Sequence, residues 1–465
     1  MAPVPMVGRA RELAVLTGLW ERVIEERRAQ FVTVFGPAGI GKSRLALELS
    51  QLVAGQGARV VRGRSTPYGA STPYSAFAQQ VKQIARIFDS DDPAHARERL
   101  QEGLAQLAGP AAAEEHAPQL AVLLGFDSEH TVADRETLFF SARVFVEALA
   151  MVGPTLLLYE DIHWADASEL DLLETLASRV RDVPVLFVAI SRPELLTERS
   201  TWGGGMPAYT ALPLDPLSQS SSRELAEQLL SVAGHDDDAS VVVETAEGNP
   251  LFIEELAASI AEKSTAGELP TSVRAIIAAR LDSLPPDERA VLVDASVVGR
   301  VFWRGALEEM GERDRLTELL GTLEARDLVR REAVSRIRGD QQYGFKHGLI
   351  HDVAYQSLPR AGRRERHAAV AHFLEATTGD AGQSNEALAH HWREAGESDR
   401  AVDCLIVAAD QAGRGWAKEH AVALYRAALD LVPEDAARHE EVRRRLAVAM
   451  MAMYHLDDAE HLRPS

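Results

Sequence analysis

The chain has 465 residues, of which 46% are apolar and 26% are charged, and its formal net charge at pH 7 is −21. This length exceeds what one hydrophobic core normally supports, so two to four domains are expected. The acidic balance argues against non-specific binding of nucleic acid or anionic membrane by the surface as a whole. The single cysteine, Cys404, excludes an internal disulfide and argues against a cysteine-based metal site.

The N-terminus has no basic region followed by an apolar stretch, so no signal peptide is predicted. The longest apolar run, residues 144–159, is interrupted by Glu147, Gly153 and Pro154 and is not expected to span a bilayer. We therefore expect a cytoplasmic protein with no membrane partner.

A phosphate-binding loop is predicted near the N-terminus. Residues 30–35 are β-branched and aromatic and predict a buried strand, and residues 42–54 have apolar positions at helical spacing. Between them lies Gly36-Pro37-Ala38-Gly39-Ile40-Gly41-Lys42-Ser43. The glycines allow successive N–H groups to surround a phosphate, Lys42 can contact the β- and γ-phosphates, and Ser43 can ligate Mg²⁺.

Four further strands are expected at residues 59–64, 155–159, 185–190 and 209–214. Because helical stretches alternate with these strands, the fold class is α/β, with a parallel sheet covered by helices on both faces. We assign residues 1–215 to this nucleotide-binding domain and residues 74–150 to a helical insertion within it.

The third strand ends at the acidic pair Glu160-Asp161. Carboxylates at this edge of the sheet can hold Mg²⁺ and polarise an attacking water, and either residue could take either role. Arg192 follows the fourth strand, where its guanidinium could reach a γ-phosphate.

Three further regions are expected downstream. Residues 216–270 form a helical lid domain, and residues 271–366 form a winged-helix domain with β-like stretches at 329–331 and 343–345. Residues 367–465 are helical and carry offsets typical of a tetratricopeptide (TPR) repeat, namely Leu405, Ala408, Ala409, Ala421, Tyr425, Ala428 and Pro433. An ordinary amphipathic helical hairpin is the alternative. A repeat array needs several units to be stable, and the sequence has room for only about one more repeat after this one. We therefore expect that the chain is a fragment, or a truncated relative, of a longer protein.

Several motifs together resemble one family. Residues 6–13 resemble the opening VGR-x-x-EL of the Orc1-like AAA ATPase domain, and residues 160–166 (EDIHWAD) resemble its ED-hydrophobic-HWAD segment. Residues 191–194, 247–256 and 345–355 are similar to its RPE, GNP-x-hydrophobic-x-EEL and FRHALIRDVAY stretches. These motifs are typical of STAND signalling ATPases, particularly modules attached to class III adenylate or guanylate cyclases and ATP-dependent LuxR-type regulators.

The resemblance implies further roles. The segment Val7-Gly8-Arg9 would lie against adenine, Pro250 would help to close the nucleotide site, and Arg192 would sense the γ-phosphate. A winged-helix histidine contacts ADP in some related switches. His347 is the candidate for this ADP contact. The alternative is that His347 only packs within the winged helix.

The expected cofactors are ATP or ADP and Mg²⁺. The candidate catalytic residues are Lys42, Glu160, Asp161 and Arg192, and the candidate Mg²⁺ ligands, directly or through water, are Ser43, Glu160 and Asp161. The candidate nucleotide-binding residues are Val7, Gly8, Arg9, Gly36, Pro37, Ala38, Gly39, Ile40, Gly41, Lys42, Ser43, Arg44, Pro250 and His347.

The leading functional hypothesis is a regulatory switch that is closed with ADP, opens with ATP and hydrolyses slowly. A protein or small-molecule inducer would bind the C-terminal helical repeats, ATP could drive homo-oligomerisation, and the output domain would lie outside this chain. The alternatives are a small-molecule kinase or remodelling motor, a DNA-binding transcriptional regulator acting through the winged helix, and a TPR scaffold with a degenerate nucleotide site. Nucleic acid is not the expected partner of this chain alone.

Overall fold

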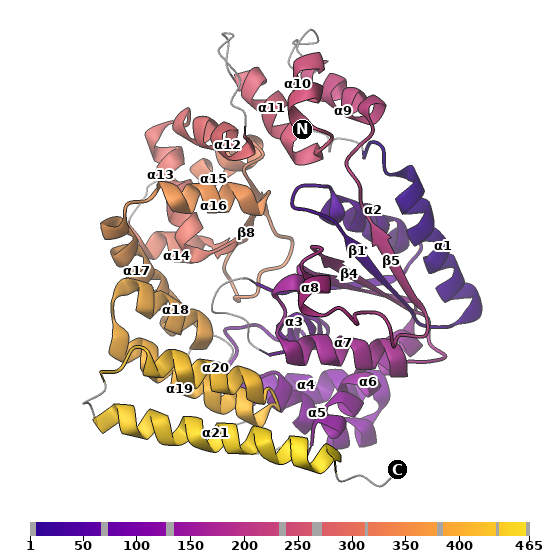
Figure 1. The fold of residues 1–465 in the computed structure, drawn as a ribbon, viewed down its shortest axis with the longest axis vertical. Helices are drawn as coiled ribbons and strands as arrows, with labels where there is room; N and C mark the ends of the chain where they lie inside the picture. The colour runs from indigo at the N-terminus through magenta and orange to yellow at the C-terminus, as the bar shows by residue number, and fades with distance from the viewer. Residues whose placement is uncertain are drawn as a thin grey trace.

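The computed structural model describes residues 6–66, 73–126, 134–231, 239–262, 272–311, 315–378, 385–433 and 437–461. Within these ranges the chain forms a central α/β region, two smaller units and a run of C-terminal helices (Figure 1). No helix of the described ranges combines the length and the apolar character needed to cross a membrane.

The central region contains a five-stranded sheet in the order β2-β3-β4-β1-β5. All neighbouring strands pair in parallel, as predicted. The strands are β1 (Gln30–Phe35), β2 (Arg59–Arg64), β3 (Thr155–Glu160), β4 (Val185–Ser191) and β5 (Tyr209–Pro213). Every residue of β1 and β4 is buried, as expected for parallel strands covered on both faces.

Successive side chains of β1 enter two different cores because side chains alternate across a strand. Val32 and Val34 join one core with the helices α1 (Ala10–Glu26) and α2 (Lys42–Gly55). Phe31 and Phe35 join the other core, which is covered by the insertion helices and α7. Those helices are α3 (Ser75–Ala85), α4 (Pro93–Ala108), α5 (Pro110–Leu123), α6 (Arg135–Val152) and α7 (Ala167–Arg179). Two short helices follow strands of the sheet: η1 (Ile162–Trp164) follows β3, and α8 (Leu195–Glu198) follows β4.

Three helices follow β5 and share a separate core, the α9–α11 unit. They are α9 (Gln219–Ser231), α10 (Ala239–Ala246) and α11 (Pro250–Glu262). Val7, from the start of the chain, packs into this core with Leu217 and Leu225. The opening segment is therefore held by a unit that follows it by more than 200 residues.

The next unit, residues 273–357, surrounds a three-stranded antiparallel sheet and is called the β6–β8 unit. The two β-like stretches expected from the sequence pair as β7 (Val329–Arg331) and β8 (Gln342–Phe345), and β6 (Val301–Trp303) adds a strand that was not expected. Its helices are α12 (Val273–Asp282), α13 (Pro286–Val298), α14 (Arg304–Glu309), α15 (Leu316–Ala325) and α16 (Gly348–Ser357).

The C-terminal helices pack each against the next. They are α17 (Arg360–Thr378), α18 (Asn385–Ala395), α19 (Ser398–Arg414), α20 (Lys418–Leu429) and α21 (Ala437–His461). The repeat-pattern residues of α19 and α20 all face one buried core, namely Leu405, Ala408, Ala409, Ala421, Tyr425 and Ala428. A TPR repeat and an ordinary helical hairpin both require this packing, so the two interpretations stay open.

The chain curves back on itself. Figure 1 shows α19 and α20 beside the insertion helices α4 and α5, far from them in sequence. Trp416 packs against the core that contains α5, and Leu123 of α5 lines the same small cavity as Ala412 of α19. The helical insertion of the α/β region and the C-terminal helices are therefore in direct contact.

Candidate nucleotide-binding site

The predicted phosphate-binding loop joins β1 to α2 at the carboxyl edge of the sheet. Gly39 and Gly41 have φ values of 80° and 101°, in the left-handed region that favours glycine. A Cβ atom on Gly39 would lie 2.7 Å from Leu251 Cβ and 2.9 Å from Asn249 Oδ1. Both backbone conformation and space therefore require glycine at this position.

Lys42 begins α2 and is buried against its own loop. Its Nζ donates to the carbonyl oxygens of Gly36 at 2.7 Å and Pro37 at 2.9 Å. Burial lowers the pKa of Lys42 to about 8, and the attraction of Asp161 opposes that shift. Ser43 follows on the first turn of α2 and is exposed, so its hydroxyl is accessible to a ligand. Arg44, in contrast, forms an ion pair with Glu48 along α2, with 2.6 Å between Nη2 and Oε1.

The GNP motif touches the loop directly. The Asn249 amide donates to the Ala38 carbonyl at 3.2 Å, and the Leu251 N–H donates to the Gly39 carbonyl at 3.2 Å. Pro250 begins α11, and its Cγ lies 4.0 Å from where a Cβ on Gly41 would be. The α9–α11 unit thus contacts the loop at the place predicted for Pro250. The role of Asn249 was missed, although the motif itself was the signal.

Arg9 ties the opening segment to the loop. Its guanidinium is 5% exposed and donates to the carbonyl oxygens of Ile40 at 2.9 Å and Asp215 at 2.7 Å. Gly8 has a φ of 70°, and a Cβ atom there would approach Ser221 to 2.7 Å. Arg9 and Gly8 therefore join the loop to the start of the α9–α11 unit.

The two carboxylates at the end of β3 have different neighbours. Glu160 Oε2 accepts from Arg64 Nε at 2.8 Å, and Arg64 lies opposite Glu160 in the register of β2 and β3. Asp161 has a φ of 58°, and its charge raises the pKa of Lys42. Arg64 thus bonds Glu160 and also lies 4.0 Å from Asp161 Oδ2, and of the two carboxylates Asp161 is the one whose charge acts on the loop lysine.

Arg64 was not singled out from the sequence. The Gln79 side chain brackets its backbone, accepting from Arg64 N–H at 3.1 Å and donating to its carbonyl at 2.9 Å. Only the strand register reveals the pairing with Glu160, and one sequence does not specify that register.

Arg192 and the HWAD residues lie together at the end of β4. The Arg192 guanidinium carbon is 5.9 Å from the centre of the Trp164 ring, and the His163 and Trp164 ring centres are 5.0 Å apart. Both ring nitrogens of His163 are buried without a hydrogen-bond partner. Burial, together with the positive charges of Arg192 and Lys42, lowers the pKa of His163 to about 4. A neutral imidazole therefore lies beside the two cations at neutral pH.

His347 contacts the α9–α11 unit. Its Nε2 is 3.5 Å from Glu254 Oε2, and Lys346 Nζ is 2.9 Å from the same oxygen. Burial opposes ionisation of Glu254, yet His347 and Lys346 hold its pKa at about 2. Glu254 lies one turn after Pro250 on α11, so His347 is linked to the loop through that turn.

These features define the fold of a P-loop NTPase, with a glycine loop between β1 and α2. The loop glycines, the buried lysine and the carboxylate acting on it fit the charge and shape of a polyphosphate. Residues 5–188 match the AAA ATPase domain family, so this part of the chain is an AAA ATPase domain.

The fold of nearly the whole chain is similar to a solved Signal Transduction ATPase with Numerous Domains (STAND) protein with a tetratricopeptide repeat sensor, from Pyrococcus horikoshii. The two share 17% identity with a TM-score of 0.53, over 99% of this chain and 64% of that chain. The Aeropyrum pernix Orc1 protein, solved with DNA, matches 76% of this chain and 94% of its own length at 14% identity and a TM-score of 0.34.

Among curated proteins, an uncharacterised protein of Rhizobium meliloti (strain 1021) is 26% identical over 453 residues. The match covers 92% of this chain and 43% of the Rhizobium protein. The chain therefore spans less than half of that relative and about two thirds of the solved STAND protein.

Proposed function

We propose that the chain is an ATP-binding regulatory switch of the STAND kind, in which the bound nucleotide sets the arrangement of the units around the AAA ATPase domain. Lys42 would hold the β- and γ-phosphates. Ser43 and Asp161 would bind Mg²⁺, directly or through water, and the ion supplies charge neutralisation for phosphoryl transfer. Arg192 would report the presence of the γ-phosphate.

One continuous series of polar contacts carries this proposal. Asn249 and Leu251 donate hydrogen bonds to the loop, and Glu254 follows on the same helix. In the β6–β8 unit, Lys346 Nζ lies 2.9 Å and His347 Nε2 lies 3.5 Å from Glu254 Oε2. A second ion pair, between Glu255 and Arg280 at 3.0 Å, is almost fully buried and joins α11 to α12. A movement of the loop on nucleotide exchange would therefore reach the β6–β8 unit through α11.

The β6–β8 unit also touches the AAA ATPase domain directly. The Asp89 N–H donates to the Arg336 carbonyl at 2.7 Å, and the Arg338 N–H donates to Ser90 Oγ at 3.0 Å. Glu332, at the start of the β7–β8 loop, adds to the negative charge around Arg64. We interpret this arrangement as the closed, ADP-type state, with the β6–β8 unit acting as a winged helix.

In this mechanism ATP favours an open state because its γ-phosphate adds charge next to Arg192 and His163. A ligand shifts such an equilibrium only through its different affinity for the two states. An inducer on the C-terminal helices would favour opening by competing with the contact that α19 and Trp416 make to α5. The open form would be the one that forms homo-oligomers, and hydrolysis would return it to the closed form.

The test is the multiple-turnover ATPase rate of the chain, with Lys42→Ala as the inactive variant and Arg22→Ala, at an exposed position on α1, as the matched control. A switch that retains ADP should turn over below about 1 s⁻¹, the lower end of typical enzyme rates. Tightly retained ADP should be measurable after gel filtration. A turnover well above that rate, with rapid ADP release, would contradict the switch and favour a dedicated enzyme.

A further inference from the structure

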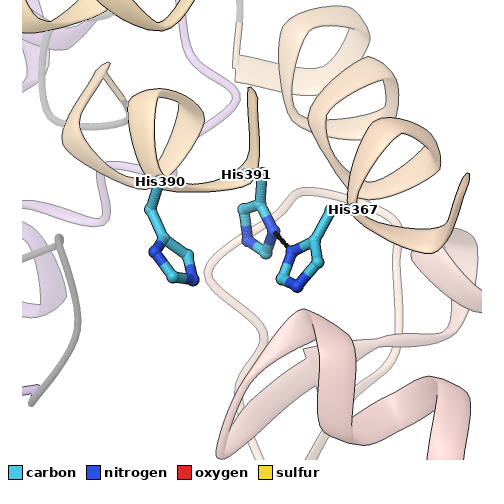
Figure 2. A group of neighbouring side chains, drawn as sticks. All are labelled: His367, His390 and His391. Carbon is cyan, nitrogen blue, oxygen red and sulfur yellow. Dashed lines mark hydrogen bonds between the residues drawn. The ribbon is translucent and has the colours of Figure 1, made fainter. Parts of the chain in front are cut away.

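Three histidines meet at the junction between the β6–β8 unit and the C-terminal helices. His367 lies on α17, and His390 and His391 are neighbours on α18 (Figure 2). One nitrogen from each ring can be chosen so that all three lie within 4.8 Å of one another. The ring centres are 5.1 to 5.6 Å apart, so the three rings form a nearly equilateral triangle.

Two of the three rings are removed from water. His367 is 0% exposed and His391 is 5% exposed, and His390 is partly exposed. Burial lowers the pKa of all three imidazoles, and their mutual proximity lowers those of His367 and His391 further. A metal ion binds an imidazole through the lone pair of a ring nitrogen, so a group of three histidine rings this close together suits metal ligation.

The polar contacts of the cluster suit metal ligation. His367 Nδ1 and His391 Nδ1 are 2.8 Å apart and share one hydrogen bond, as drawn in Figure 2. The other nitrogen of His367, Nε2, is 3.0 Å from the Tyr355 hydroxyl. With Nδ1 bound to a metal, Nε2 carries the proton and donates to Tyr355, as the second ring nitrogen of a ligating histidine usually does.

We propose that His367, His390 and His391 form a binding site for a divalent transition-metal ion of the Zn²⁺ type. Three nitrogen donors without a carboxylate match the ligand preference of Zn²⁺ and disfavour Mg²⁺ and Ca²⁺, which take oxygen ligands. A tetrahedral site with Zn–N bonds of about 2.0–2.1 Å needs ligand nitrogens about 3.3 Å apart. The close His367–His391 pair opens by roughly 0.5 Å and the longer separations close by at most about 1.5 Å, through ring rotation, to satisfy those bond lengths.

The position of the site gives the ion a structural consequence. It would cross-link α17 to α18, and Tyr355 would extend the link to α16. These helices connect the β6–β8 unit to the C-terminal helices that contact the AAA ATPase domain. The fourth coordination position is open to water, and the charged side chains whose electrostatics act on the cluster are Glu394, Arg393 and Arg363. Of these, only Glu394 could offer a ligand atom.

The test uses the full chain after treatment with a chelator. Co²⁺ is titrated in as a spectroscopic substitute for Zn²⁺, with excess Mg²⁺ present to occupy oxygen sites. The expected result is one equivalent of Co²⁺ with the visible absorption of a low-coordinate site, displaced by one equivalent of Zn²⁺. Zn²⁺ should also raise the unfolding temperature, because an ion that binds only the folded state stabilises it.

His390→Gln is the first variant because His390 is the most exposed of the three histidines and its loss disturbs the core least. It should abolish the Co²⁺ spectrum, and His391→Gln should do the same. Tyr355→Phe should keep the spectrum and weaken binding about 10- to 100-fold, the usual effect of losing an outer-shell partner. His372→Gln is the matched control, since His372 lies on α17 with its side chain 54% exposed, outside the cluster.

Circular dichroism of each variant separates a lost ligand from a lost fold. Two results would overturn the proposal. The parent chain could bind no Co²⁺ with nitrogen-type absorption, which would leave the histidines as a hydrogen-bonded core cluster. Alternatively, a folded His390→Gln variant could bind Co²⁺ as tightly as His372→Gln.

Discussion

Arg338, in the loop between β7 and β8, donates from Nη2 to Asp91 Oδ1 of the AAA ATPase domain at 2.7 Å, across 247 residues of sequence. The Asp91 side chain is 4% exposed and also accepts from the Phe88 N–H at 3.0 Å. The Arg338 guanidinium carbon lies 4.6 Å from the centre of the Phe88 ring. This contact holds the β6–β8 unit against the insertion at a point away from the nucleotide loop.

Arg338→Ala should loosen the closed arrangement. Losing a charge-assisted hydrogen bond to a buried carboxylate costs about 1.5–3 kcal/mol. Arg99 Nε lies 3.9 Å from Asp91 and would offset part of this loss by remaining as a partner of the carboxylate. If about 1–2 kcal/mol of that loss falls on the closed state alone, ADP should dissociate about 5- to 30-fold faster. Stopped-flow release of a fluorescent ADP analogue measures this directly. Arg331→Ala, at an exposed position on β7, is the control and should leave the rate unchanged. Equal rates in both variants would show that the contact does not restrain the closed state.

Glu160 and Asp161 are expected to differ in their effects, Asp161 on ATP hydrolysis and Glu160 on stability. Asp161→Asn is expected to lower ATP turnover by about 10²–10⁴-fold while ATP still binds, because the amide is a poorer ligand for Mg²⁺ and a poorer acceptor for the proton of the attacking water. Glu160→Gln should affect stability more than turnover, because Arg64 loses a charged partner and such hydrogen bonds contribute about 1.5–3 kcal/mol. Denaturant unfolding and single-turnover hydrolysis, measured on both variants, distinguish the two effects. The reverse pattern would assign the hydrolytic role to Glu160.

The affinity for ATP should depend on pH through Lys42. Burial places the pKa of Lys42 at about 8 without nucleotide, and a bound triphosphate favours the charged form. Above pH 8 the lysine must take up a proton on binding, so the association constant should fall by up to about tenfold per pH unit. Below pH 8 it should be nearly constant. Lys42→Arg keeps its charge throughout this range and should bind with little pH dependence, whatever its absolute affinity. Isothermal titration between pH 7 and 9.5 tests this, and parallel slopes for both proteins would rule Lys42 out as the source.

Much of the nucleotide site could be predicted because local sequence determines it. The loop glycines, Lys42 and the strand before them form one contiguous segment, and β3 was expected at 155–159 and found at Thr155–Glu160. The motif containing Pro250 lies against the loop, with Pro250 Cγ 4.0 Å from where a Cβ on Gly41 would be. The pairing of Arg64 with Glu160 depends on strand register, and the contact of Arg338 with Asp91 depends on how two units dock. Neither depends on local propensity, so one sequence does not reveal them. β6 was missed because three residues are too few for a periodic pattern.

Glu169 should make the stability of the AAA ATPase domain depend on pH. This carboxyl, on α7, is 1% exposed and accepts from the N–H groups of Ala76 at 2.8 Å and Phe77 at 3.1 Å at the start of α3. Burial, reinforced by the negative charge of Asp166, raises its pKa from 4.5 to about 8. The native state therefore binds this proton more tightly than the unfolded state, and its contribution to stability is complete below about pH 4.5. That contribution is lost progressively as the pH rises to about 8.

The glutamine variant Glu169→Gln isolates this contribution, because its amide oxygen can accept the same two backbone hydrogen bonds without ionising. Between pH 5.5 and 8.5 the unfolding free energy of the parent chain should fall by roughly 3 kcal/mol more than that of Glu169→Gln, a few pKa units being worth about 1.4 kcal/mol each. Glu115→Gln, whose parent carboxylate is 74% exposed, should follow the parent chain. Urea unfolding across this range, followed by fluorescence, gives the three curves. Parallel curves for the parent and Glu169→Gln would mean that the two backbone N–H groups stabilise the ionised carboxylate enough to cancel the effect of burial.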